Sequence, residues 1–283
     1  MRTTLIPLMM LLTACGGRSD RLTVGAKNFT EQLILGEIVA QHLEKRVGQP
    51  VDRKFNLGGA LLAQTALTSG QIDLLPEYTG TALTTVLKLP PNSSPGETLQ
   101  QVREGYKQWH LEWLDPLGFN NTFAMVVRKA DADRLNIRTL SEAANAQPWK
   151  LGVGYEFLTR PDGWPGLQKA YALRMDGNPT TMDLGLLYAA LRSGRVDLAA
   201  ANSTDGLLAT GEFTVLEDDR SYFPPYQAAI VARGAALTPE VRKALNELSG
   251  AIDDTVMRRL NYEVAGRQRQ ATEVAREFLA SKR

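Results

Sequence analysis

Apolar and polar positions change periodicity repeatedly along the first part of the chain. Short apolar runs of strand length occupy residues 22–25, 51–55 and 72–75. Between them, residues 28–43 and 61–69 carry apolar side chains at helical spacing, with Asn28 or Thr30 as the expected cap of the first helix. The order strand, helix, strand, helix, strand predicts an α/β fold with a doubly wound, largely parallel sheet.

The same rhythm returns in the second half of the chain. Residues 150–154 and 196–200 read as strands, residues 164–174 and 185–193 as helices, and the tail beyond residue 239 as helical. Both halves contain one local pattern, a helix ended by Ser-Gly and followed by a polar residue, an apolar residue, Asp and Leu: Ser69-Gly-Gln-Ile-Asp73-Leu and Ser193-Gly-Arg-Val-Asp197-Leu. We therefore expect the same structural device once in each of two lobes.

Two Pro- and aromatic-rich segments, residues 113–123 and 222–226, separate these halves. We interpret them as two crossings between a first lobe, residues 22–122 and 228–283, and a second lobe, residues 123–227. A chain that crosses twice between α/β lobes forms a hinged cleft. Because ligands of such sheets bind beyond the carboxyl ends of the strands, we expect the site in this cleft.

The N-terminus is the most hydrophobic part of the chain. Residues 5–12 are mostly apolar but too few to span a bilayer, which takes about 20, and they suit a secretory signal. Leu12-Thr13-Ala14-Cys15 resembles a bacterial lipobox. We predict a signal peptide at residues 1–14, a lipid on Cys15 and a tether at 15–21, and hence an exported, membrane-anchored lipoprotein at the periplasm or cell surface. Cys15 is the only cysteine, so no intramolecular disulfide can form.

The charge balance narrows the classes of partner. The 283 residues include 32 Lys and Arg against 31 Asp and Glu, without a basic block. Such a chain offers no electrostatic reason to bind nucleic acid or a membrane surface, so membrane contact is expected only through the lipid. With 43% hydrophobic residues there is ample material for a core.

Catalytic motifs are not apparent. The sequence has two histidines and lacks a Gly-x-Ser-x-Gly elbow, an HExxH helix, a CxxC pair and a P-loop. We expect neither an enzyme nor a metal or other cofactor. Schiff-base chemistry at Lys27 or a general base at Glu77 stays open on the sequence alone.

Six segments carry a recognisable pattern in order along the chain: VGAKNFTEQ from Val24, LGG from Leu57, GQIDLLPEYTGT from Gly70, FLTRPDG from Phe157, STDG from Ser203 and FPPY from Phe223. Together they resemble the glycine betaine/choline/carnitine-binding proteins of osmoprotectant ABC importers. The resemblance implies a type II periplasmic-binding-protein fold with a two-strand hinge, a monomer, and ABC permease and ATPase subunits as partners.

The same resemblance implies a ligand with a quaternary ammonium in an aromatic box and a carboxylate held by basic and hydroxyl groups. Ring faces attract a cation that has no N–H donors, and Arg donates to carboxylates through its fork. Carried over position by position, the carboxylate ligands are Lys27, Thr81 and Arg160, and the box positions are Tyr78, Tyr226, Phe123 and Asn202.

Asn202 departs from the box pattern because it has no ring face. Losing one wall costs about 1 kcal/mol, roughly tenfold in affinity. Weak glycine betaine binding and a different zwitterion, such as ergothioneine or an amino-acid derivative, both remain open, as does a sensor role. The α-ammonium of an amino acid has N–H donors and would need an Asp or Glu beside it, and none of the four box positions is an Asp or Glu. Tyr155 or Trp164 could supply the missing wall.

Overall fold

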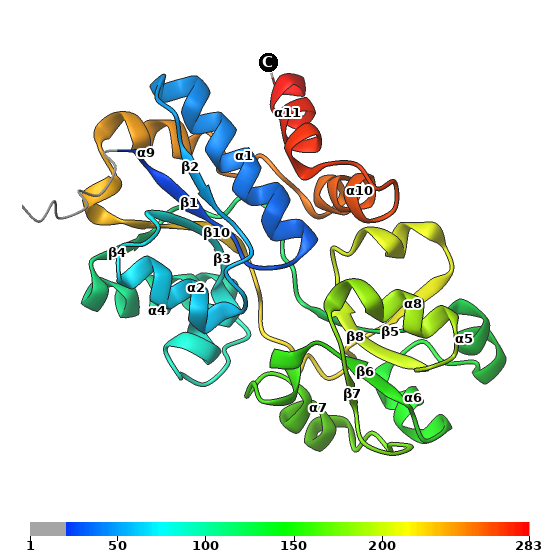
Figure 1. Cartoon of the computed structure of the whole chain (residues 1–283). Coiled ribbons are helices and arrows are strands. Elements are labelled where there is room, and N and C mark those ends of the chain that lie inside the picture. The colour runs from blue at the N-terminus through cyan, green and yellow to red at the C-terminus, as the bar shows by residue number, and fades with distance from the viewer. Residues whose placement is uncertain (1–20, 283) are drawn as a thin grey trace, which may run out of the picture.

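The computed structural model describes residues 21–282, which form two α/β lobes lying side by side (Figure 1). The lobes share one architecture, a five-stranded sheet covered by helices on both faces. The predicted α/β, two-lobed fold is confirmed. The predicted signal peptide, Cys15 and nearly all of the tether lie outside the described residues.

The sheet of the first lobe has the strand order β2-β1-β3-β10-β4. β1 is parallel to β2 and β3, whereas β10 runs antiparallel between β3 and β4. The strands are β1 Thr23–Gly25, β2 Asp52–Lys54, β3 Leu74–Tyr78, β4 Leu111–Trp113 and β10 Ala228–Arg233.

Alternate residues of these strands enter two different cores. Leu74 and Ile230 pack with α1, α9, α10 and α11, whereas Leu75 and Val231 pack with α2 and α4. The helical segments are α1 Thr30–Val47, α2 Ala60–Thr68, α3 Thr79–Thr81, η1 Ala82–Val86, α4 Pro95–Tyr106, η2 Lys107–Trp109, η6 Gly234–Ala236, α9 Pro239–Asn246, α10 Asp254–Ala265 and α11 Ala271–Ser281.

The second lobe repeats the arrangement with the order β7-β6-β8-β5-β9. β6 is parallel to β7 and β8, and β5 runs antiparallel between β8 and β9. The strands are β5 Phe123–Arg128, β6 Leu151–Val153, β7 Thr180–Thr181, β8 Leu198–Asn202 and β9 Phe213–Leu216.

Helices again cover both faces of this sheet. Met125 and Val127 of β5 face the core that includes α5, α6 and α7, and Val126 between them faces α8. The helical segments are α5 Lys129–Leu135, α6 Leu140–Ala146, η3 Tyr155–Leu158, α7 Trp164–Tyr171, η4 Leu184–Leu186, α8 Leu187–Arg192 and η5 Gly206–Thr210.

The chain passes from β4 of the first sheet to β5 of the second, and returns from β9 to β10. The two crossings lie side by side, since Asn120 forms an antiparallel bridge with Gln227 and its Oδ1 accepts from the Tyr226 N–H at 2.6 Å. Helix α10, which precedes the C-terminal helix α11, packs against η5 of the second lobe. The lobe boundaries at residues 122/123 and 227/228 stay a prediction.

Two local expectations differ from the structure. Phe29, not Asn28 or Thr30, is the N-cap of α1, and it makes no side-chain cap hydrogen bond. The strands expected at 72–75 and 196–200 begin two residues later and extend to Tyr78 and Asn202. Residues expected in loops after these strands are therefore their last residues, which fixes their positions more firmly.

Candidate functional site

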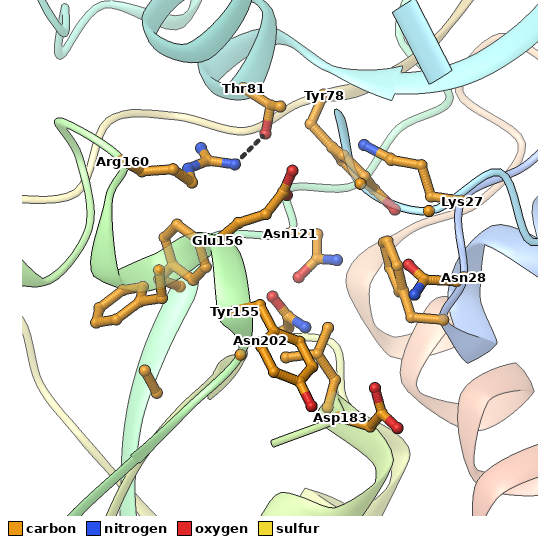
Figure 2. Close-up of a pocket in the computed structure, with 18 of the residues that line it drawn as sticks. Lys27, Asn28, Tyr78, Thr81, Asn121, Tyr155, Glu156, Arg160, Asp183 and Asn202 are labelled. Atoms are coloured by element: carbon orange, nitrogen blue, oxygen red, sulfur yellow. Dashed lines mark hydrogen bonds between the residues drawn. The ribbon is translucent and has the colours of Figure 1, made fainter. Parts of the chain in front are cut away.

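A cavity of about 190 Å³ lies between the lobes. It opens at the ends of β3 and β8, whose last residues are Tyr78 and Asn202, and Figure 2 shows side chains of both lobes around it. The structure brings all seven predicted ligand-binding residues to this one cavity: Lys27, Tyr78, Thr81, Phe123, Arg160, Asn202 and Tyr226. Their contact with a ligand stays a prediction.

Strand pairing explains why residues far apart in sequence meet here. Phe123 opens β5 and lies opposite Asn202 at the end of β8, while Tyr78 at the end of β3 lies opposite Ala228. Tyr226 stands two residues before Ala228. Tyr78 and Asn202 thus reach the cavity at the ends of β3 and β8, and Phe123 and Tyr226 reach it where the crossings meet the sheets.

The rings form two groups. Tyr78 stacks with Phe29, with ring centroids 6.3 Å apart, on the side of the first lobe. Phe123 meets Tyr226 and Phe157 edge to face, with centroids 5.6 and 4.8 Å apart. All five rings line the cavity, so its apolar surface is largely aromatic.

Arg160 is buried beside the second ring group and is paired with Asp162. Its Nε and Nη2 donate to the two carboxylate oxygens at 2.9 and 2.6 Å, and its Nη1 donates to Thr81 Oγ1 at 3.2 Å across the cleft (Figure 2). Burial alone would lower the pKa of Arg160, but the Asp162 carboxylate raises it above its ordinary value. The guanidinium therefore stays charged. One edge of it binds Asp162, and Nη1 donates to Thr81.

Asp162 is itself held by several donors. Besides Arg160, it accepts hydrogen bonds from Thr84 Oγ1 at 2.9 Å and from the Tyr226 hydroxyl. Burial works to raise the pKa of this carboxyl, yet Arg160 holds it below its usual value. Thr84 belongs to the first lobe and Arg160 to the second, so the pair also joins the two sides of the cleft.

Lys27 is paired in the same manner on the other side. Its Nζ lies 2.6 Å from Glu77 Oε1, and both side chains are almost fully buried. The ammonium also lies 4.7 Å from the Tyr78 ring centroid. Lys27 thus already has a carboxylate and an aromatic face as partners within its own lobe.

Asn202 is placed by Asp205, three residues further along. One oxygen of the Asp205 carboxylate accepts from the Asn202 backbone N–H at 3.0 Å and from the Tyr188 hydroxyl at 2.9 Å. Burial raises the pKa of Asp205 to about 6. The backbone at the missing wall position is therefore anchored by Asp205, although Asn202 offers no ring.

Sequence reasoning missed Phe29, Phe157 and Glu156, which line the cavity. The two phenylalanines gave no signal because Phe is an ordinary core residue. Of the two candidates for the missing wall, Tyr155 lines the cavity and is 63% exposed, whereas Trp164 packs in the core of the second lobe.

Glu156 bridges the mouth of the cavity. Its Oε1, from η3 of the second lobe, accepts from the Ala60 N–H at 2.9 Å, at the first residue of α2 in the first lobe. A Cβ on the neighbouring Gly59 would lie 2.1 Å from the same oxygen. Glycine at this position therefore permits the cross-cleft contact, and the N-terminal end of α2 favours the negative charge.

Within residues 21–282, no cluster of His, Cys, Asp and Glu is arranged to hold a metal ion. None of the helices in that range combines the length and hydrophobicity that a bilayer crossing requires.

Comparison with known proteins establishes the family. Residues 20–281 match the family described as the substrate binding domain of the ABC-type glycine betaine transport system. The chain belongs to this family. Its members are solute-binding proteins of transporters rather than enzymes, and this binding protein works with an ABC permease.

Two relatives illustrate the range of ligands for which similar proteins are named. The binding protein is 32% identical to the carnitine transport binding protein of Listeria monocytogenes, over 97% of this chain and 93% of that one. It is 36% identical to the ergothioneine transport permease/ergothioneine binding protein of Helicobacter pylori, over 91% of this chain but only 47% of the relative.

A solved structure supports the same placement. The crystal structure of a glycine betaine/carnitine/choline ABC transporter component superposes with a TM-score of 0.77 at 32% identity, covering 92% of this chain and 98% of that chain. The resemblance read from the sequence is therefore confirmed at the level of family and fold.

Proposed function

We propose that this binding protein captures a zwitterion with a quaternary ammonium, of the glycine betaine type, in the interlobe cavity and delivers it to the permease. The observation that carries the proposal is the composition of one cavity, in which six aromatic rings, those of Phe29, Tyr78, Phe123, Tyr155, Phe157 and Tyr226, lie together with a buried, oriented Arg160. A methylated cation and a carboxylate need these two kinds of surface.

The cationic head would lie against the rings. A trimethylammonium group has no N–H to donate, so hydrogen bonds cannot recognise it, whereas ring faces attract it by about 0.5–2 kcal/mol for each favourable contact. The ring groups of Tyr78 and Phe123 stand on opposite lobes. Closure of the lobes would bring both groups onto one ligand.

The carboxylate would lie at Arg160 and Thr81. Nη1 of Arg160 and the hydroxyl of Thr81 meet at 3.2 Å, and both residues line the cavity. A charge-assisted bond from a guanidinium contributes about 1.5–3 kcal/mol. Lys27 adds positive potential nearby, although Glu77 already neutralises it.

A second ligand is favoured by one specific observation. Asn202 places an amide, in place of a ring, at the cavity wall, and Asp205 holds its backbone N–H. An amide can hydrogen-bond a ligand that bears a polar ring, such as the imidazole of ergothioneine, and a 36% identical relative is named for ergothioneine. Ergothioneine, itself a betaine, is therefore our second candidate.

We further propose that the protein is exported, processed before Cys15, lipid-anchored through that residue and monomeric. The apolar run at residues 5–12 and the motif ending at Cys15 support this. Replacing Cys15 with Ser is expected to move the protein from the membrane fraction to the soluble extracytoplasmic fraction. Retention of the C15S variant in the membrane fraction would contradict the anchor.

Thermal unfolding of the purified protein with a panel of ligands tests the binding proposal. Glycine betaine, carnitine, choline and ergothioneine are compared with glycine, which has the same carboxylate as glycine betaine but an ammonium with N–H donors. Binding to the native state raises the unfolding midpoint. We expect at least one methylated compound to raise it and glycine to leave it unchanged. An equal shift with glycine, or no shift with any methylated compound, would refute the proposal.

A further inference from the structure

Glu31 is a buried acid that lines no part of the cavity, yet it joins the parts that form it. It stands in the first turn of α1 and is 3% exposed. Its Oε1 accepts from the Tyr78 hydroxyl and from Asn121 Nδ2, both at 2.7 Å. Its Oε2 accepts from Thr204 Oγ1 at 2.5 Å and from Asn261 Nδ2 at 2.9 Å.

The four donors come from four different segments. Tyr78 ends β3, Asn121 lies on the crossing before β5, Thr204 follows β8 in the second lobe, and Asn261 is in α10. All four are neutral donors, and together they fill both oxygens of the carboxylate. One side chain thus connects both lobes and a crossing segment behind the cavity.

The amide groups are oriented around this carboxylate. The Oδ1 atoms of Asn121 and Asn261 are buried without a hydrogen-bond partner among the described residues. Turning either amide over would place its oxygen against the Glu31 carboxylate. Both amides therefore direct their nitrogens to Glu31 and leave a carbonyl unsatisfied, which makes the Glu31 carboxyl the common acceptor for the two side chains.

Tyr78 connects this junction to the ligand site. Its ring lines the cavity, while its hydroxyl donates to Glu31 and accepts from Gln32 Nε2 at 3.2 Å. A phenol held at its far end cannot swing away from the cavity. The orientation of a predicted aromatic wall therefore depends on Glu31.

The second lobe is held at the same place. Asn261 Nδ2 also donates to the Thr204 carbonyl at 2.8 Å, and Arg258 Nε donates to the Ser203 carbonyl at 3.0 Å. A Cβ on Gly206 would lie 2.3 Å from the Tyr262 backbone nitrogen, so α10 approaches the second lobe as closely as glycine permits. Glu31 lies at the centre of this interlobe contact.

We propose that Glu31 is a positioning residue for ligand binding, which sets the Tyr78 ring against the cavity and holds the second lobe in the geometry that closes over the ligand. The effect of Glu31 on ligand affinity can be measured only if the proposed function holds, so this part of the inference rests on that function. The effect of Glu31 on the distances between the lobes can be measured without a ligand.

Glu31→Gln is the informative change because it conserves shape. A neutral amide has one acceptor oxygen, and its NH₂ would face two of the four donors. Asp197→Asn is the matched control: Asp197 accepts from the Lys150 N–H at 2.7 Å and does not line the cavity. Tyr78→Phe keeps the ring and removes only the hydroxyl that Glu31 holds.

Calorimetric titration with the ligand found in the thermal panel measures the effect on affinity. We expect at least tenfold weaker binding for E31Q, about fivefold for Y78F, and less than twofold for D197N even where D197N lowers the unfolding midpoint. The E31Q/Y78F double variant should bind the ligand at most about twofold more weakly than E31Q does, because both changes disrupt the same hydrogen bond between Tyr78 and Glu31. Affinity of E31Q within twofold of the parent would overturn the proposal.

Small-angle scattering of the ligand-free proteins gives the second readout. E31Q should show a wider distribution of distances between the lobes than the parent, and D197N should not. If the parent binds no compound in the panel, the proposed function fails, and this measurement alone decides the role of Glu31. Identical distributions for E31Q and the parent would then overturn it.

Discussion

The cavity-lining cations of the two lobes, Lys27 and Arg160, differ in the hydrogen bonds that they can still donate. Each lobe buries one cation beside a carboxylate of its own, Lys27 with Glu77 in the first lobe and Arg160 with Asp162 in the second. The ammonium of Lys27 is a point charge already balanced at 2.6 Å. The guanidinium of Arg160 gives two nitrogens to Asp162 and still directs Nη1 toward Thr81.

This difference follows from the shapes of the two groups. A planar guanidinium can bind one carboxylate along one edge and still donate a hydrogen bond in a second, fixed direction. An ammonium is a compact charge without a second edge in a fixed direction. We infer that the first lobe uses its pair mainly for stability and the second uses its pair to orient a ligand donor.

The largest effect is expected from Lys27→Met. Removing one partner of a buried ion pair leaves the other charge uncompensated, which costs about 3–5 kcal/mol. We expect chemical denaturation to show a loss of this size in the free energy of unfolding, while ligand affinity falls less than in an Arg160 variant. The double variant K27M/E77M, with both charges gone, should recover much of the loss. If K27M is as stable as the parent, the inference that the Lys27–Glu77 pair mainly stabilises the fold is wrong.

Arg160→Ala should weaken binding by roughly a hundredfold, because a charge-assisted bond contributes about 1.5–3 kcal/mol. Titration calorimetry with the natural ligand measures it. Arg160→Lys, which keeps the charge but loses the fork, is the control and should fall between the parent and R160A. Equal affinity of R160A and the parent would place the anion elsewhere.

Asn202→Tyr tests the wall that the second lobe lacks. A new ring face should strengthen glycine betaine binding by up to about tenfold, since one cation–π contact is worth about 0.5–2 kcal/mol. The same change should weaken ergothioneine binding if the amide hydrogen-bonds that ligand. Weaker binding of glycine betaine to N202Y would favour ergothioneine as the natural ligand.

The smallest effect concerns pH and the support of Asn202. Burial raises the pKa of Asp205 from 3.8 to about 6. The folded protein therefore holds this proton more tightly than the unfolded chain, so its contribution to stability grows as pH falls below 6 and is lost as pH rises through 6. Between pH 7 and 5, the parent should gain about 1 kcal/mol of stability relative to D205N. Parallel pH profiles for the two proteins would contradict the assignment.

The alternation of strands and helices and the duplicated Asp motif were predictable from sequence. Asp73 accepts from the Thr23 N–H at 3.0 Å and Asp197 from the Lys150 N–H at 2.7 Å, so each bonds the start of the neighbouring parallel strand. The prediction of one device per lobe is confirmed. Periodicity sufficed because each motif spans one helix end and one strand.

Long-range pairing within the site was not predictable. Glu77 stands 50 residues from Lys27, and the Oε1 contact of Glu156 reaches 96 residues back to Ala60. Local patterns contain no information about such partners. Phe29 was also missed, because its place beside the cavity depends on how α1 begins and not on its residue type.

The decisive experiment is a crystal structure of the protein with glycine betaine or, if that compound does not bind, with the strongest ligand of the panel. We predict a quaternary nitrogen among the rings of Tyr78, Phe123 and Tyr226, with a carboxylate oxygen within hydrogen-bond distance of Arg160 Nη1 and Thr81 Oγ1. A ligand without a fixed positive charge in that cavity, or a bound betaine whose carboxylate avoids Arg160, would contradict it.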